Sequence, residues 1–163
     1  MIIPLLSILP RVADSESLDL KQLARASTTV VIGEVLTQRA EVDSNGISTY
    51  VTIIVNDTLK GRDREVIDVR VPGGSFGDLE VIVPGTPKFI NDTEVLLFLN
   101  GSTIVGVDDG AMIIEGGRAW RAANSKEFTL PHLLFPSLDI LDSSYYFDSW
   151  DLEDVRYVVS RKN

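Results

Sequence analysis

Two β-prone runs lie close together in the first part of the chain: TTVVIGEV (28–35) and ISTYVTIIVNDTL (47–59). The second run alternates, with valine or isoleucine at positions 51, 53 and 55, so we expect one buried and one solvent-facing side. Gly33 interrupts the first run, and a glycine inside a strand is typical of a bulge or a bend at a barrel corner. Asp43-Ser44-Asn45-Gly46 predicts a hairpin turn between the two strands.

Further β-prone runs follow as far as residue 121, and glycine, proline or asparagine separates them. They are EVIDVRV (65–71), Leu79–Val83, EVLLFL (94–99), Thr103–Val107, Ala111–Glu115 and Ala119–Arg121. EVLLFL is almost continuously apolar, which is typical of a strand buried on both faces. Short strands with turns about every 8–12 residues predict a mainly β domain. The long second strand after a glycine-bent first one favours a small, partly open barrel of the OB type, with five to six strands, over a flat sandwich.

Two helices are expected to flank the strands. Ser17 is a suitable N-cap for a short helix at 18–26, and Ser149 for a final helix at 150–161 with an acidic first turn and a basic last turn. Residues 123–147 show no clear period and are predicted to form a packed, irregular segment. We therefore divide the chain into an apolar arm or signal-peptide remnant (1–13), an OB-like β-barrel domain (14–122), and an irregular extension with a C-terminal helix packed on the barrel (123–163).

Composition restricts the function classes. The 163 residues are 44% hydrophobic, which is enough for a folded core. The net charge of −9 repels phosphate backbones and anionic membrane surfaces, so we expect no nucleic-acid partner. The absence of cysteine excludes disulfides, thiolate metal sites and a cysteine nucleophile. Ile2–Leu9 resembles the core of a signal peptide, but no Lys or Arg precedes it. No other segment approaches the roughly 18 apolar residues of a membrane span, so we expect no stable membrane insertion.

The residues that could carry chemistry form no clear constellation. His132 is the only histidine, and a Ser–His–Asp arrangement would need it together with Ser125 or Ser137 and Asp139. Its neighbours are apolar, which favours a structural histidine. The carboxylate groups at 108–109, 139–142 and 151–154 match a turn, a loop and a helix start better than the spacings of a glycosidase or a calcium loop. We predict no catalytic residue, no metal site and no cofactor.

The segment PGGSFG (72–77) is the predicted contact surface. Adjacent glycines permit positive φ angles and close approach of another backbone, and Phe76 lies in the same loop. A second turn, PGTP (84–87), is expected beside it at the barrel mouth. The predicted partner-binding residues are Pro72, Gly73, Gly74, Phe76, Pro84 and Gly85. The alternative is a plain connection between strands in which Phe76 covers the core.

The order of these motifs resembles a known group of proteins. The motifs are LARA (23–26), TTVVIGEV (28–35), TYVTIIVNDTLKG (49–61), VIDVRVPGG (66–74), VIVPGTPKF (81–89) and EVLLFL (94–99). They resemble uncharacterised prokaryotic proteins, typically exported, with a netrin-like OB-fold, to which the tissue inhibitors of metalloproteinases are distantly related. Those inhibitors chelate the catalytic zinc through an N-terminal cysteine, which this chain lacks, so the resemblance extends to the barrel alone.

Together these features predict a non-enzymatic protein-binding module of netrin-like OB type, extracellular or at the cell surface, with the cytoplasm as the alternative. One alternative function is an inhibitor or chaperone of an extracellular protease. Others are a hydrolase using His132 and a single-stranded nucleic-acid binder. Tyr145–Phe147 and Trp150 are interpreted as locking the final helix onto the barrel. N-glycosylation sequons begin at Asn56, Asn91 and Asn100.

Overall fold

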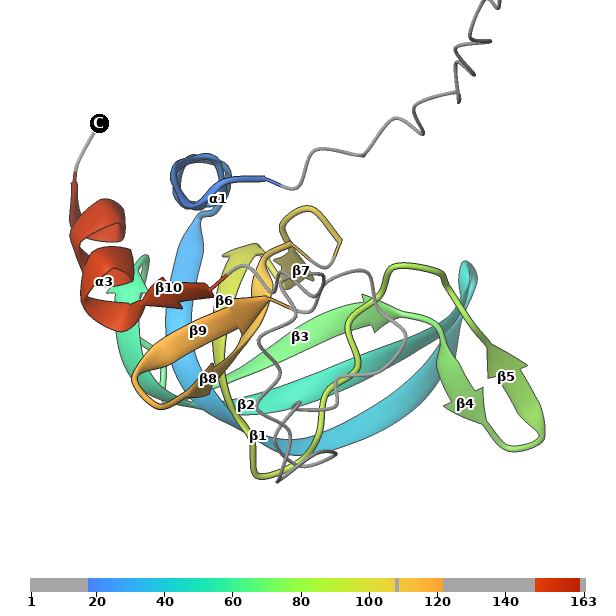
Figure 1. Ribbon diagram of the computed structural model, residues 1–163. Coiled ribbons are helices and arrows are strands. Elements are labelled where there is room, and N and C mark those ends of the chain that lie inside the picture. Colours follow the sequence, from blue (N-terminus) through green and yellow to red (C-terminus); the bar gives the residue numbers. More distant parts are fainter. Residues whose placement is uncertain (1–17, 108, 122–148, 162–163) are drawn as a thin grey trace, which may run out of the picture.

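The computed structural model describes residues 18–107, 109–121 and 149–161, and Figure 1 labels its elements. Most of the described chain is β-strand, with a short helix before the strands and another after them. Along the chain the elements are α1 (Leu20–Ala26), β1 (Thr29–Asp43), β2 (Gly46–Lys60), β3 (Val66–Pro72), β4 (Gly74–Phe76), β5 (Leu79–Val81), β6 (Glu94–Asn100), β7 (Thr103–Ile104), β8 (Ala111–Glu115), β9 (Arg118–Arg121), β10 (Ser149–Asp151) and α3 (Leu152–Ser160).

Five strands close into a barrel. They follow the order β1-β2-β3-β7-β6, and β6 pairs back onto β1. All of these pairings are antiparallel except β3–β7, which is parallel and joins Arg70 to Thr103. β8 pairs with the middle of β6, at Val95–Leu97, and begins a side sheet that continues through β9 and β10. The predicted fold class, a mainly β protein with a small barrel and a helix near each end of the domain, is confirmed.

Two hydrophobic clusters share strands β1 and β6, because alternate residues of each strand point to opposite faces. The inner core fills the barrel and contains Val31, Val35, Val51, Ile53, Val69, Val71, Val95, Leu97, Leu99, Ile104 and Ala111. The outer core lies between the barrel, the side sheet and the helices, and contains Leu20, Leu23, Val30, Ile32, Leu96, Phe98, Met112, Ala119, Val155 and Val159. The prediction that EVLLFL is buried on both faces is therefore confirmed.

The glycine in β1 permits a close approach of two strands. The β1–β2 register shifts between Ile32 and Gly33, which confirms the predicted bulge. A Cβ atom at Gly33 would lie 2.4 Å from the carbonyl oxygen of Ile54, so no larger residue fits without moving the backbone. Beyond this point β1 continues to Asp43 rather than ending near residue 35, since β2 pairs with it as far as the predicted hairpin turn.

Both predicted helix starts are wrong by a few residues. α1 is capped by Asp19, whose carboxylate accepts a hydrogen bond from the Gln22 N–H at 2.8 Å, whereas Ser17 lies outside the described residues. α3 is capped by Asp151, and Ser149 instead belongs to β10 because it pairs with Trp120 of β9. The last turn of α3 contains no basic residue, contrary to the prediction, because the helix ends before Arg161.

Candidate binding surface

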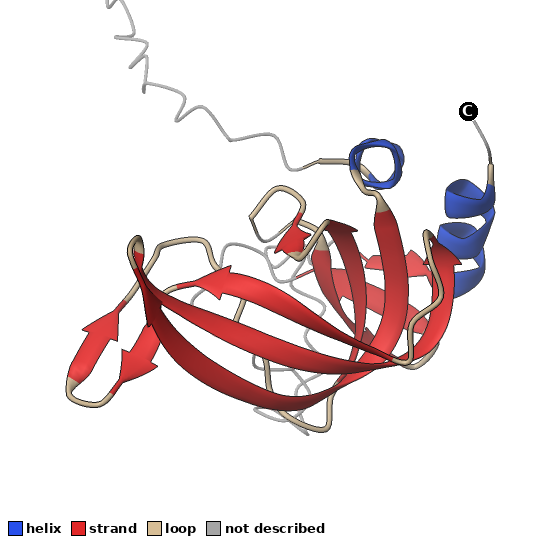
Figure 2. Cartoon of the chain, turned by 180° about the vertical axis from the view of Figure 1, so that it is seen from behind, coloured by secondary structure: helices blue, strands red, loops and turns tan. Residues whose placement is uncertain are grey.

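A short β-hairpin stands apart from the barrel. Within the described part of the chain, β4 and β5 pair only with each other, and in both views they project from the end of the molecule away from α1 and α3 (Figures 1 and 2). Phe76 lies opposite Leu79, and Gly74 lies opposite Val81. Leu79 and Val81 are two positions apart in β5, so the side chains of Phe76, Leu79 and Val81 share one face of the hairpin.

These side chains are exposed to solvent. The exposed fraction is 50% for Phe76, 65% for Leu79, 42% for Val81 and 78% for Ile82, which directly follows β5. We call these four residues the hairpin patch. Isolated exposed apolar residues are common, but a group of them on one projecting element marks a candidate contact surface.

The structure separates the six residues predicted for partner binding. Phe76 belongs to the hairpin patch, and its exposure shows that the alternative in which it covers the core is wrong. Pro72, Gly73 and Gly74 line a groove at the root of the hairpin, whereas Pro84 and Gly85 form a turn beyond this groove. Leu79, Val81 and Ile82 were missed because the run at 79–83 was predicted to be a barrel strand. That prediction is wrong, since β5 ends at Val81 and is absent from the barrel sheet.

The groove has a volume of about 320 Å³. Its lining includes Thr49 of β2, Val71 of β3 and Val81 of β5, together with Val83 and Phe89. Its size lies at the lower end of the roughly 300–1,000 Å³ that is usual for small-ligand sites. The groove and the hairpin patch share Val81 and Ile82, so a partner on the patch would also reach the groove.

Gly74 fixes the hairpin to the barrel. Its φ angle is +131°, and a Cβ atom there would lie 2.2 Å from Thr49 Oγ1. That hydroxyl donates a hydrogen bond to the carbonyl oxygen of Gly73 at 2.8 Å, and the Gly73 N–H donates to the carbonyl oxygen of Ile47 at 2.9 Å. A larger residue at position 74 would disturb this anchor, so substitutions that test binding belong in the hairpin patch itself.

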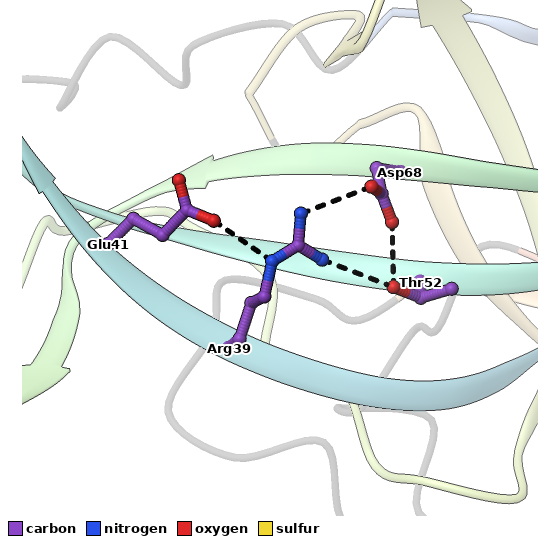
Figure 3. Close-up of polar contacts among 4 residues, drawn as sticks. All are labelled: Arg39, Glu41, Thr52 and Asp68. Carbon is purple, nitrogen blue, oxygen red and sulfur yellow. Dashed lines mark hydrogen bonds and ion pairs between the residues drawn. The ribbon is translucent and has the colours of Figure 1, made fainter.

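A polar network covers the exposed face of β1, β2 and β3 (Figure 3). Arg39 contacts Glu41 at 2.9 Å and Asp68 at 3.2 Å, and Thr52 Oγ1 donates a hydrogen bond to Asp68 at 2.6 Å. Two hydrogen bonds to the carboxylate lower the pKa of Asp68: the one from Thr52 has the larger effect, and the one from Arg39 the smaller. The hydrogen bonds that Arg39 donates raise its own pKa, and the bond to Asp68 has a larger effect than the bond to Glu41.

This network predicts a pH effect. Because the pKa of Asp68 is lower in the folded chain than its ordinary value of 3.8, the ionised network stabilises the fold above that value. The stabilisation is lost as the pH falls through the folded-state pKa. Asp68→Asn should therefore lose less stability than the wild type between pH 7 and pH 3, as measured by urea unfolding at a series of pH values. Asp63→Asn, in an exposed loop, is the control; equal pH profiles for wild type and Asp68→Asn would contradict the prediction.

Metal and membrane sites can be assessed only within the described residues. There, no group of three or more histidine, aspartate and glutamate side chains could hold a metal ion. No helix in the described ranges is long and apolar enough to cross a membrane. His132, Ser125, Ser137 and Asp139, the residues of the hydrolase alternative, lie outside the described residues, as do Tyr145–Phe147.

Comparison with known proteins adds no family. The chain matches no protein-family model, and neither the curated proteins nor the solved structures give a match. The resemblance to netrin-like proteins therefore stays a prediction, and any function has to be argued from the surface.

Proposed function

We propose that this protein is a non-enzymatic protein-binding module and that the hairpin patch is its contact surface. The observation that carries the proposal is the grouping of the exposed Phe76, Leu79 and Val81 on a hairpin that projects from the barrel, with the exposed Ile82 directly after it. Burial of such side chains against a partner stabilises the complex by about 25 cal/mol for each Å² of apolar surface removed from water. An aromatic residue among them also fits the composition of protein interfaces.

The backbone of the hairpin offers a second means of binding. Among the described residues, β5 pairs with β4 on one edge and with no strand on the other. An unpaired edge can accept an extended segment of a partner through main-chain hydrogen bonds, and the side chains of the patch then give specificity. We therefore propose a protein partner rather than a small molecule for this surface.

The more specific proposals rest on other support. A protease partner, an extracellular or cell-surface location and the netrin-like relationship rest on the sequence resemblance.

The exposed face of β1–β3 gives little support to single-stranded nucleic-acid binding, because its arginines face carboxylates. Arg39 pairs with Glu41 and Asp68, and Arg70 pairs with Asp43 at 3.3 Å. A phosphate backbone would have to displace these carboxylates.

The proposal predicts that binding depends on the patch. The variant Phe76→Ser/Leu79→Ser/Ile82→Ser should lose a partner that the wild-type chain captures from the lysate and medium of its source organism, because it removes the exposed apolar contact area. Quantitative mass spectrometry of the captured proteins is the measurement. Thermal unfolding should change little, because exposed substitutions usually alter stability by no more than about 0.5 kcal/mol each.

The control variant is Leu36→Ser/Val42→Ser. It removes exposed apolar side chains from β1, where the exposed fractions are 48% and 53%. A partner that binds through the hairpin should be retained by this variant. Retention of every captured protein by the triple hairpin variant would contradict the proposed contact surface.

A further inference from the structure

A second cavity lies at the other end of the molecule, where α1 and α3 stand next to each other (Figures 1 and 2). It has a volume of about 840 Å³ and is bounded by both helices and the last residues of β2. Its apolar lining comes from Ala24, Leu59, Val158 and Val159, which belong to the outer core or pack against it. The volume lies within the range of about 300–1,000 Å³ that is usual for sites of drug-sized ligands.

The charged residues that line this cavity in the described chain are all basic. Lys21, Arg25, Lys60 and Arg161 line it, and no Asp or Glu is among its described lining residues. The whole chain has 24 acidic residues and only 15 Lys and Arg, so this arrangement opposes the overall charge of −9. A concave surface with one sign of charge and low-dielectric walls concentrates the field and attracts a ligand of opposite charge.

The cations on α1 have no carboxylate partner among the described residues. Lys21 and Arg25 are exposed and stand four positions apart, so they are neighbours on one side of the helix. Like charges at this spacing destabilise a helix, and α1 has only seven residues. A bound anion would remove the repulsion.

The other two cations are held in place. Lys60 is half-buried, and its ammonium donates a hydrogen bond to the carbonyl oxygen of Ala24 at 2.6 Å. An ammonium has three N–H donors, which leaves two for a ligand. The guanidinium of Arg161 lies 4.6 Å from the centre of the Tyr157 ring, which also lines the cavity. The cavity thus combines anchored cations with an apolar floor.

We propose that this cavity binds a small amphiphilic anion, in which a carboxylate or phosphate headgroup is attached to an apolar body. The headgroup contacts Lys21, Arg25 and Lys60, and the apolar body packs on Leu59 and Val158. This site is separate from the hairpin patch, so either proposal can fail without the other.

Isothermal titration of the full chain with dodecanoate, at concentrations below micelle formation, tests the proposal. We expect one saturable site that weakens as salt is added, because the cations at the rim are solvent-exposed. Lys21→Gln/Arg25→Gln should weaken binding by about tenfold or more, since a charge-assisted hydrogen bond contributes more than the 1.4 kcal/mol that corresponds to tenfold. Dodecyl phosphate should bind in the same way if the headgroup is read as a charge, and the stronger of the two anions identifies the headgroup.

Three controls give the test its specificity. Dodecyltrimethylammonium has the same tail with a cationic head and should not bind, and inorganic phosphate alone should bind far more weakly than dodecyl phosphate. The variants Phe76→Ser/Leu79→Ser and Lys88→Gln change surfaces outside the cavity and should bind dodecanoate normally. The proposal is overturned if dodecanoate does not bind, if the cationic amphiphile binds equally, or if the α1 variant leaves the affinity unchanged.

Discussion

Arg121→Ala is expected to lower the free energy of unfolding by about 3–5 kcal/mol, because it removes a buried guanidinium and leaves a largely buried carboxylate without its cation. Arg121 Nη1 lies 3.3 Å from Asp109 Oδ1, and the two side chains are only 7% and 16% exposed. Arg121 also donates a hydrogen bond to the carbonyl oxygen of Leu18 at 2.6 Å, and its guanidinium lies 4.8 Å from the centre of the Trp150 ring. Asp109 in turn accepts a hydrogen bond from the Leu18 N–H at 3.1 Å.

The matched control for this prediction is Arg156→Ala. Arg156 pairs with Asp57, but these side chains are 43% and 39% exposed, and exposed ion pairs contribute only about 0–1 kcal/mol. Urea unfolding of both variants gives the comparison. A loss for Arg121→Ala that is no larger than the loss for Arg156→Ala would show that the buried pair does not hold the start of α1 against the side sheet.

Local sequence patterns predicted much of the barrel, because the forces that set those features act between neighbours in the chain. The apolar run at 94–99, the turn at 43–46 and the bulge at Gly33 each follow from side-chain period or backbone geometry over a few residues. The contact of Arg121 with Leu18 spans 103 positions and leaves no local signal. The same is true of the cationic cavity, whose basic residues come from α1, the end of β2 and the residue after α3.

The hairpin shows a different limit of sequence reasoning. The run at 79–83 has the composition of a barrel strand, and composition does not reveal whether a strand joins a sheet or projects from it. The missed signal is Gly77-Asp78, a two-residue turn that directly joins β4 to β5. A turn placed so soon after Gly73-Gly74 leaves only three residues for β4, and β5 folds back to pair with these three residues instead of joining the barrel sheet.

Phe98→Ala is expected to lower the free energy of unfolding by about 3–5 kcal/mol, the range for removing a buried phenylalanine from a core. Phe98 is completely buried in the outer core, with Leu23, Met112 and Val155. The cavity left by the ring would lie where β6, α1 and α3 meet, so neither helix could fill it without leaving its other contacts. Urea denaturation followed by circular dichroism measures the loss.

Phe76→Ala provides the same substitution on an exposed ring, and we expect it to change stability by no more than about 0.5 kcal/mol. The difference in the free energy of unfolding between the two variants distinguishes a buried ring that stabilises the fold from a ring that is exposed to solvent. If Phe76→Ala cost as much as Phe98→Ala, the ring of Phe76 would have to be buried in solution. The hairpin patch would then be part of a core rather than a contact surface, and the proposed binding function would lose the observation on which it rests.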